Sequence, residues 1–360
     1  MIKKSEIRAL TGFRGIAALV VASYHFARGL GENSFFVVSS GYIAVDAFFV
    51  LSGYVLAYNY AETFADRFDR NDYRDFLIRR ICRIYPAYLG ILALATVKVS
   101  ANLGGGGPPM VLDAWDAFCN IFMLTGWGLH ATPIIGVSWS VSAELFCYLL
   151  FPLFALLTKG NVTLLWAVAV AFFGGIVCLA RLGLGVQGPM DIVSPDHSYS
   201  LLRAACGFGL GVIGYSIAVR TALGDQGVVT RLLPVCICIL AVSWYFDETD
   251  LIKYALLVCL VWLIAQGSRI GEGIFGNRIV YFVGEVSYSL YLIHPLLISF
   301  SVKLAKRLFL LIGSEVAFVL ALLAYLLLTI ALSYVSYRAF ELKGKNLMLK
   351  FLLPRRRPAI

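Results

Sequence analysis

The first long apolar segment of the chain contains an arginine and a histidine where a membrane-spanning helix normally carries hydrocarbon side chains. Arg14 and His25 lie eleven residues apart in RALTGFRGIAALVVASYHFAR, residues 8–28. At 3.6 residues per turn, this spacing places both side chains within about 20° of one helix face and roughly 16 Å apart along the axis. Ionisable groups at such depth are costly and usually face a bundle interior or a wet cavity. The pair therefore predicts a functional site; the alternative is a snorkelling arginine and a hydrogen-bonded core histidine.

A carboxylate stands in the next apolar segment, DAFFVLSGYVLAY, which begins at Asp46. If this helix returns antiparallel to the first, Asp46 reaches a depth comparable with that of His25, where a carboxylate would orient the imidazole or raise its basicity. The alternative is a structural ion pair between Asp46 and an arginine. Further along, Ser52 and Gly53 interrupt the bulky residues and allow a close helix approach.

Three arginines gather at the start of the third apolar segment, FLIRRICRIYPAYL. Arg79, Arg80 and Arg83 are spaced three and four residues apart, so they cluster on one helix. Ordinary positive charge at a cytoplasmic helix end explains any one of them. Three together are typical of a phosphate clamp, and coenzyme A carries a pyrophosphate and a 3′-phosphate that such a clamp would suit.

Two later segments each carry one more ionisable residue at membrane depth. Glu144 lies in GVSWSVSAELFCYLLFP, beside Trp139, and His294 lies in VGEVSYSLYLIHPLL, directly before a proline. Trp139 is also typical of an interfacial aromatic belt. A carboxylate facing lipid would cost energy with no return, so Glu144 is expected to face the interior. A lone histidine is more often structural, but His294 is expected to line the same cavity as the other residues.

These residues must be positioned by membrane-spanning helices, because the composition is that of a polytopic membrane protein. The 360 residues are 60% hydrophobic and only 14% charged, against about 25% charged in soluble domains. The expected fold is all-α, a single bundle of ten transmembrane helices. The spans are predicted near residues 8–28, 40–60, 77–99, 137–157, 162–182, 200–220, 232–246, 251–268, 279–300 and 310–338.

Lysine and arginine in the short loops predict the orientation, with both termini cytoplasmic. Positive residues alternate onto one side of the expected bundle, and Lys303, Lys306 and Arg307 break the pattern. This distribution accounts for the net charge of +9, so membrane lipids are expected partners and nucleic acid is not. The eight cysteines show no metal-ligand spacing, and no metal is expected.

No linker divides the chain, so one membrane domain is expected over residues 1–345, followed by a basic cytoplasmic tail over residues 346–360. Residues 102–109 read as an extracytoplasmic turn. Residues 113–129 are amphipathic and too interrupted to span, so they are expected at the outer interface or dipping into the fold.

The five motifs quoted above, taken in order from residue 8 to about residue 298, resemble those of the acyltransferase family 3 membrane proteins. The resemblance implies transfer of an acyl group, commonly acetyl from acetyl-CoA, to a hydroxyl of a glycan or another extracytoplasmic acceptor. It implies that Arg14 and His25 are the essential pair, and it matches Arg83, with Arg80 beside it, to the family's third motif. Ser52 and Gly53 match its second motif, and Glu144 and His294 match its later ones.

The resemblance also sets expectations for partners and location. The acceptor is expected to be a glycan or lipid-linked saccharide, with lipopolysaccharide O-antigen or exopolysaccharide first; peptidoglycan, lipo-oligosaccharides and macrolide-like molecules stay open. The expected location is the bacterial inner membrane. Some family members carry an additional SGNH hydrolase-like domain. The chain stops at Ile360, soon after its last span, so it is expected to act alone or with a separate periplasmic helper.

The mechanism expected from these residues runs from one side of the membrane to the other. Arg80 and Arg83 hold the phosphates of cytoplasmic acyl-CoA, and Arg14 binds a phosphate or polarises the thioester carbonyl. His25 then acts as general base on the acceptor hydroxyl or becomes transiently acylated. The rival class is a secondary transporter or flippase with a buried proton relay, but the chain has no paired, similar halves of the kind that transporters favour.

Overall fold

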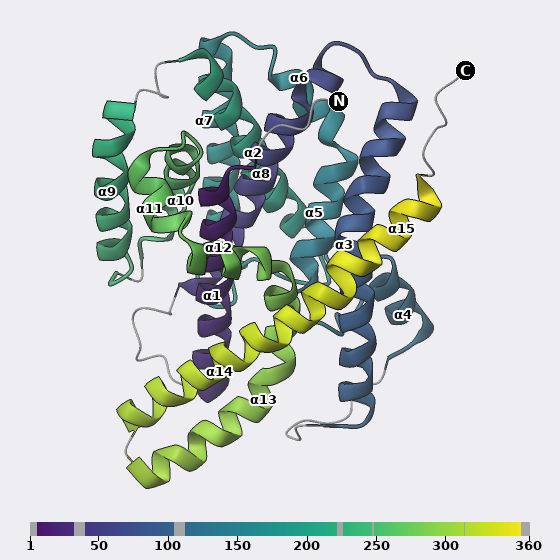
Figure 1. Ribbon diagram of the computed structural model, residues 1–360, viewed down its shortest axis with the longest axis vertical. Coiled ribbons are helices and arrows are strands. Elements are labelled where there is room, and N and C mark those ends of the chain that lie inside the picture. Colours follow the sequence, from purple (N-terminus) through teal and green to yellow (C-terminus); the bar gives the residue numbers. More distant parts are fainter. Residues whose placement is uncertain are drawn as a thin grey trace.

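The computed structural model describes residues 6–31, 40–103, 112–221, 226–246, 248–312 and 314–353. Every regular element in these ranges is a helix, and the described chain contains no strand. Figure 1 shows the helices gathered into one bundle, with α9 at its edge and the long α14–α15 rod crossing its front. The expected all-α class is therefore confirmed. Part of the 102–109 turn, Asp247 and the last seven residues lie outside the described ranges.

The first half of the chain supplies the helices that carry most of the predicted site residues. Asp69 caps α3 by accepting hydrogen bonds from two backbone amides, and Asp113 and Asp116 form a capping box at the start of α4. The elements are α1 (Arg8–Leu30), a 3-10 turn (Gly41–Ile43), α2 (Ala44–Ala65), α3 (Arg70–Ser100), α4 (Ala114–Ile121), α5 (Ser138–Leu149) and α6 (Phe151–Leu157).

The second half closes the bundle around these helices. Asn161 caps α7, Ser268 caps α11 and Asn277 caps α12, each with its side-chain oxygen on a first-turn amide. The elements are α7 (Val162–Arg181), α8 (Tyr199–Arg220), α9 (Gln226–Ser243), α10 (Asp250–Ile264), α11 (Arg269–Phe275), α12 (Arg278–Glu285), α13 (Ser287–Ile312), α14 (Ser314–Ser336), a π-helix (Tyr337–Gly344) and α15 (Lys345–Leu352).

A helix stands at each of the ten predicted spans, but fewer meet the length and apolarity of a complete crossing. Within the described residues, six helices do so, or up to eight if each bent pair counts as one span. The bent pairs are α5 with α6, at 63°, and α10 with α11, at 111°. The chain is thus a multi-pass membrane protein.

Glycines bring the central helices into close contact. A Cβ at Gly53 would lie 2.0 Å from the Phe208 carbonyl oxygen, and one at Gly211 would lie 2.1 Å from the Val50 carbonyl oxygen. Only glycine lets the α2 and α8 backbones meet this closely. The predicted close approach at Ser52–Gly53 is confirmed.

Two irregularities shape the helices around the site. The helical pattern breaks at Val286, between α12 and α13, at a point where Gly15 of α1 lies against the backbone of Gly284. At the other irregularity, the π-helix joins α14 to α15 without interrupting the rod seen in Figure 1. π-Helices are rare and frequently occur at functional sites. Arg14 contacts the break at Val286, and the π-helix contains Glu341.

Candidate active site

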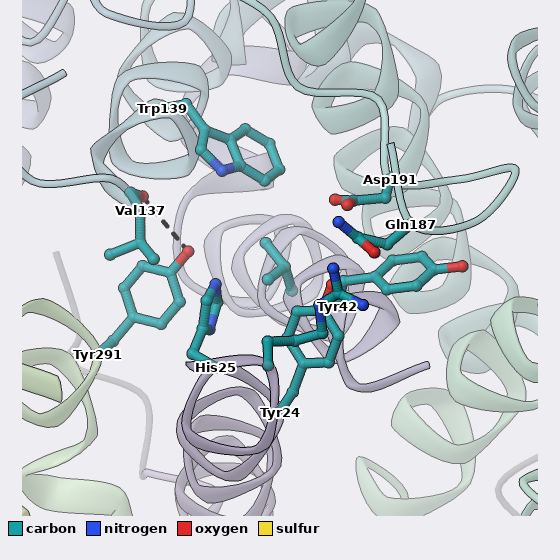
Figure 2. A pocket seen from close by; sticks show the side chains of 10 residues that line it. Tyr24, His25, Tyr42, Val137, Trp139, Gln187, Asp191 and Tyr291 are labelled. Atoms are coloured by element: carbon teal, nitrogen blue, oxygen red, sulfur yellow. Dashed lines mark hydrogen bonds between the residues drawn. The ribbon is translucent and has the colours of Figure 1, made fainter. Parts of the chain in front are cut away.

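A cavity of about 280 Å3 lies at the end of α1 farthest from Arg8. Its walls come from α1, the start of α2, the start of α5, the α7–α8 loop and α13, so it collects residues that are far apart in the sequence. Figure 2 shows His25 beneath the cavity, Trp139 above it, Tyr291 on one side and Gln187 with Asp191 on the other. His25 is the predicted site residue at this cavity; Trp139 was assigned either to an interfacial belt or to the interior, and Gln187 and Asp191 were not predicted.

The hydrogen bonding of His25 assigns its tautomer. The Nδ1 atom lies 2.9 Å from the Val21 carbonyl oxygen, which accepts hydrogen bonds only, so Nδ1 must carry the proton in this contact. In neutral imidazole the other nitrogen, Nε2, is then unprotonated. The His25 side chain lines the cavity, and Figure 2 shows a ring nitrogen directed into it. His25 is therefore arranged as a base toward whatever occupies the cavity.

His294 packs directly against His25. Its Nε2 atom lies 3.3 Å from His25 Nδ1, and the two rings stand 5.0 Å apart between centroids. His294 is fully buried. The single Nδ1–H of His25 is then shared between the Val21 carbonyl oxygen, at 2.9 Å, and His294 Nε2, the longer contact, which accepts. Both acceptors would support the extra positive charge when His25 gains a proton. His294 was expected to line the cavity; it does not, but it lies directly behind His25, which does.

Asp46 does not reach His25, contrary to the expectation of a carboxylate beside the imidazole. It accepts two hydrogen bonds from Arg203 of α8, 2.8 Å from Nε and 2.6 Å from Nη2, and both side chains are 1% exposed. A buried carboxylate needs a cationic partner, and the guanidinium offers the bidentate fit that an imidazole cannot. The alternative, a structural ion pair with an arginine, is what the structure contains.

Arg203 also supports the roof of the cavity. Its guanidinium carbon lies 5.5 Å from the centre of the Trp139 ring, a cation–π distance, and Trp139 is 7% exposed. Arg203 is a charged residue inside a predicted span, the same signal that singled out Arg14 and His25, so sequence analysis could have found it.

A second buried charge network stands behind the cavity. Tyr42 donates a short hydrogen bond to Asp250, and Lys253 donates to Ser40 Oγ at 2.7 Å and to the Phe246 carbonyl oxygen at 2.9 Å. Lys253 and Asp250 form an ion pair at 3.7 Å. The network ties the start of α10 to the start of α2 and so fixes the Tyr42 side of the cavity.

The α7–α8 loop completes the wall opposite His25 with Gln187 and Asp191. Burial raises the pKa of the Asp191 carboxyl, while the positive charges of Arg203 and Arg28 and a backbone hydrogen bond from Gln187 act in the opposite direction. The loop contributes a polar wall to an otherwise largely aromatic cavity.

Arg14 lies deeper along the same face of α1, at the break between α12 and α13. Its Nε donates to Ser287 Oγ at 2.9 Å, and its Nη2 donates to the Gly284 carbonyl oxygen at 3.1 Å. Since His25 contacts His294 on α13, both α1 residues face the same neighbour, as the eleven-residue spacing predicts. Arg14 therefore satisfies a carbonyl at the C-terminal end of α12, a structural task in addition to any chemical one.

Charged residues from three other elements lie near Arg14. The charges of Arg83, Glu341 and Glu144 act on it. Glu144 accepts hydrogen bonds from Ser52 Oγ at 2.8 Å and Tyr148 at 2.6 Å. We call Arg14, Arg83, Glu144 and Glu341 the inner cluster. Glu144 belongs to this cluster and not to the cavity, although Trp139 is only five residues away.

The remaining predicted donor-site residues divide into two groups. Arg80 is half-buried and donates to the Tyr60 hydroxyl at 3.2 Å, whereas Arg79 is exposed; neither is among the charges that act on Arg14. Gly53 packs against α8, so its placement gives it a packing role. Of the predicted residues Ser52 and Gly53, Ser52 contacts the inner cluster, because its hydroxyl donates to Glu144.

Glu341 is an inner-cluster residue that sequence analysis missed. It lies in the π-helix and accepts hydrogen bonds from the Ser289 hydroxyl at 2.6 Å and the Ser289 amide at 3.1 Å. Ser289 is in the first turn of α13, so the carboxylate sits at a helix N-terminus, where negative charge is stabilised. Glu341 follows the last predicted span, which ends at residue 338, in a stretch rich in lysine and arginine, and so gave no sign of facing the interior.

The described residues contain no group of three or more histidine, cysteine, aspartate or glutamate side chains placed to hold a metal ion. The arrangement is instead a helical membrane protein with a base-bearing cavity toward one end and a charged cluster deeper on the same helix face. Such an arrangement is suited to acid–base chemistry within the membrane.

The chain belongs to the family described as the acyltransferase domain, whose family model matches residues 7–338. It is similar to the acyltransferase MdmB of Streptomyces mycarofaciens, 27% identical over 83% of this chain and 81% of that protein. It is also similar to a putative O-acetyltransferase of Staphylococcus aureus strain COL, 23% identical over 83% of this chain and 52% of that protein. The peptidoglycan O-acetyltransferase OatA of Listeria monocytogenes is 28% identical over 42% of this chain and 25% of that protein.

The chain therefore spans about half the length of the staphylococcal relative. No solved structure matches it. Family membership and the names of these relatives identify the chain as an enzyme that transfers acyl groups.

Proposed function

We propose that this protein is an integral-membrane O-acyltransferase of the bacterial inner membrane. It moves an acyl group, acetyl by default, from cytoplasmic acyl-CoA to a hydroxyl of an extracytoplasmic glycan such as O-antigen or exopolysaccharide. The observation that carries the proposal is His25, whose Nδ1–H is held by Val21 while the unprotonated Nε2 serves the cavity. A base held in one tautomer is what activation of a hydroxyl requires.

The transfer step follows from this geometry. The acceptor hydroxyl gives its proton to His25 Nε2 as its oxygen bonds to the acyl carbon. The carbon–sulfur bond of the thioester then breaks, and the coenzyme A thiolate leaves and takes up the proton from His25. His294, 3.3 Å from His25 Nδ1, accepts a hydrogen bond from the charged imidazolium during this step.

The inner cluster supports a donor site on the cytoplasmic side. Arg83 and Arg14 lie close enough for their charges to interact, and Arg80 stands one turn before Arg83 on α3. Guanidinium groups bind phosphate in a bidentate manner, so this cluster suits the phosphates of acyl-CoA. In this proposal, the roughly 16 Å between Arg14 and His25 along α1 is crossed by the pantetheine arm.

The names of the relatives support the class of acceptor. OatA is named for peptidoglycan, a glycan, and the staphylococcal relatives are named as O-acetyltransferases. An outward-facing cavity at the His25 end would receive such an acceptor, in agreement with the alternation of positive loops.

The test is acyl transfer by the purified protein in liposomes, with radiolabelled acetyl-CoA and bacterial surface glycans. We expect label to pass to glycan, and His25→Gln should lower the rate by about 100-fold or more, the contribution typical of a general base. His130→Gln is the matched control, because His130 is an exposed histidine bound to Asp196 outside the cavity. Its activity should equal that of the native protein.

Two results would contradict the proposal. A His25→Gln protein that folds and transfers acetyl at the native rate would remove His25 from the chemistry. Uptake of labelled compound into the liposomes without covalent transfer would favour the rival class, a transporter or flippase with a proton relay.

A further inference from the structure

The loop between α7 and α8, residues 182–198, is built to present two polar side chains to the cavity. Gln187 and Asp191 line it, while Met190 and Ile192 of the same loop are 2% and 1% exposed and anchor the loop in the core. Gly188 rests directly on the other wall: a Cβ there would lie 1.9 Å from the Tyr42 hydroxyl oxygen. The polar side chains thus stand on a loop seated against the bundle.

The far end of the loop is fastened as well. The His130 amide donates to the Pro195 carbonyl oxygen at 2.9 Å, and Ser198 Oγ donates to the Trp127 carbonyl oxygen at 2.8 Å. Inside the loop, the Asp191 amide donates to the Gly188 carbonyl oxygen at 2.9 Å. A loop bound at its far end and along its middle holds Gln187 and Asp191 in place before any ligand arrives.

The polar groups around the cavity, which include Arg28, Gln187 and Asp191, suit a ligand with several hydroxyls. An amide both donates and accepts hydrogen bonds and a carboxylate accepts them, so together they can bind neighbouring hydroxyls. The Trp139 ring also lines the cavity and adds apolar surface, which suits the C–H groups of a sugar ring. At about 280 Å3 the cavity is at the small end of ligand sites, so it suits a single ring and not a large macrocycle.

We propose that Gln187 and Asp191 are specificity-determining residues, which bind hydroxyls of a saccharide ring that neighbour the hydroxyl acylated at His25. The inference rests on the proposed function and adds to it the residues that select the acceptor. Figure 2 shows the required geometry: the two side chains face His25 from the opposite wall, with Trp139 above the space between them.

A purely structural role for Asp191 is the competing explanation, since its carboxylate also accepts a hydrogen bond from the Gln187 backbone. Asp191→Asn keeps an oxygen for that contact and removes the charge. Asp196→Asn is the matched control: it changes an exposed carboxylate of the same loop that binds His130 outside the cavity.

The experiment measures acetyl transfer from acetyl-CoA, by the full protein in liposomes, to methyl hexopyranosides, their single-deoxy analogues and hexanol. Free coenzyme A is measured in parallel. For the best hexopyranoside, we expect Asp191→Asn to lower kcat/KM by roughly 10- to 100-fold, the range for a hydrogen bond to a charged group. The loss should lie in the KM for the acceptor, with the KM for acetyl-CoA unchanged.

The deoxy analogues provide the decisive comparison. The analogue that lacks the hydroxyl bound by Asp191 should react equally with the native protein and with Asp191→Asn. Gln187→Leu should show the same pattern with a different analogue. Asp196→Asn should react as the native protein does with every acceptor.

Three results would overturn the inference. The first is that Asp191→Asn lowers kcat/KM equally for every acceptor, deoxy analogues included. The second is that the native protein transfers acetyl to hexanol as fast as to the sugars. The third is release of coenzyme A by the native protein with no transfer to any hexopyranoside. If the native protein releases no coenzyme A at all, the proposed function itself fails, and the inference fails with it.

Discussion

At the scale of single residues, the ion pair of Asp46 and Arg203 has the largest energetic consequence. Both side chains are 1% exposed, so water cannot compensate a charge whose partner is lost. Removing one member of such a pair typically costs about 3–5 kcal/mol, whereas replacing both with apolar residues of similar size is often neutral. Each residue of the pair is therefore needed as long as the other is present, although the pair as a whole adds little net stability.

We accordingly expect Asp46→Asn to destabilise the protein by about 3–5 kcal/mol, because Arg203 then keeps an uncompensated buried charge. The double variant Asp46→Leu with Arg203→Met should recover most of the loss. Thermal unfolding in detergent, followed by tryptophan fluorescence, measures both. Asp66→Asn is the control, since its ion pair with Lys159 is exposed and should contribute little. A single variant as stable as the native protein would show that the pair is not needed.

At the scale of helices, the crossing of α2 and α8 depends on the absence of side chains. Gly53→Ala would place a methyl carbon 2.0 Å from the Phe208 carbonyl oxygen, so one backbone must move. Overpacking of this kind costs about 1–3 kcal/mol. We expect a lower Tm and less folded protein in size-exclusion chromatography.

Gly273→Ala is the matched control for this prediction. Gly273 is also in a helix, but a Cβ there would meet nothing within 4 Å, so the substitution should leave Tm unchanged or raise it slightly through better helix propensity. Equal effects of the two substitutions would mean that the close approach of α2 and α8 does not limit stability.

At the scale of the whole molecule, the proposed route from cytoplasmic donor to outer acceptor requires opposite exposure of two loops. Asp196 belongs to the loop that walls the cavity, and Asp66 follows α2 at its other end; both side chains are exposed. In a background with Cys178, Cys238 and Cys259 changed to serine, a membrane-impermeant maleimide should label Asp196→Cys in intact cells. It should label Asp66→Cys only after the membrane is opened. The reverse pattern would invert the orientation.

The features that could be predicted from the sequence are those that depend only on residues near one another in the chain. Apolar length predicts the helices, and a charge inside an apolar segment identifies Arg14, His25, Glu144 and His294 as interior residues. The eleven-residue spacing correctly places the first two on one face, because helix geometry depends on nothing else.

What could not be predicted depends on partners distant in sequence. Asp46 pairs with Arg203, 157 positions away, and no local pattern selects an arginine over the imidazole of His25. Glu341, in the π-helix, reaches Ser289, 52 positions away, from a segment that follows the last predicted span. Gln187 and Asp191 lie in a glycine- and proline-containing loop. Because the loop has no helical periodicity, the sequence does not indicate that either side chain faces the interior.

The contact of Arg14 with the break between α12 and α13 has an evolutionary consequence. One guanidinium both holds Gly284 and Ser287 together and, in the proposed function, serves the donor. A descendant enzyme that adopted a different donor would lose the chemical reason for this arginine and keep the architectural one. The position would thus stay arginine through changes of chemistry, and its persistence among diverged sequences would be a poor guide to which reaction each of them performs.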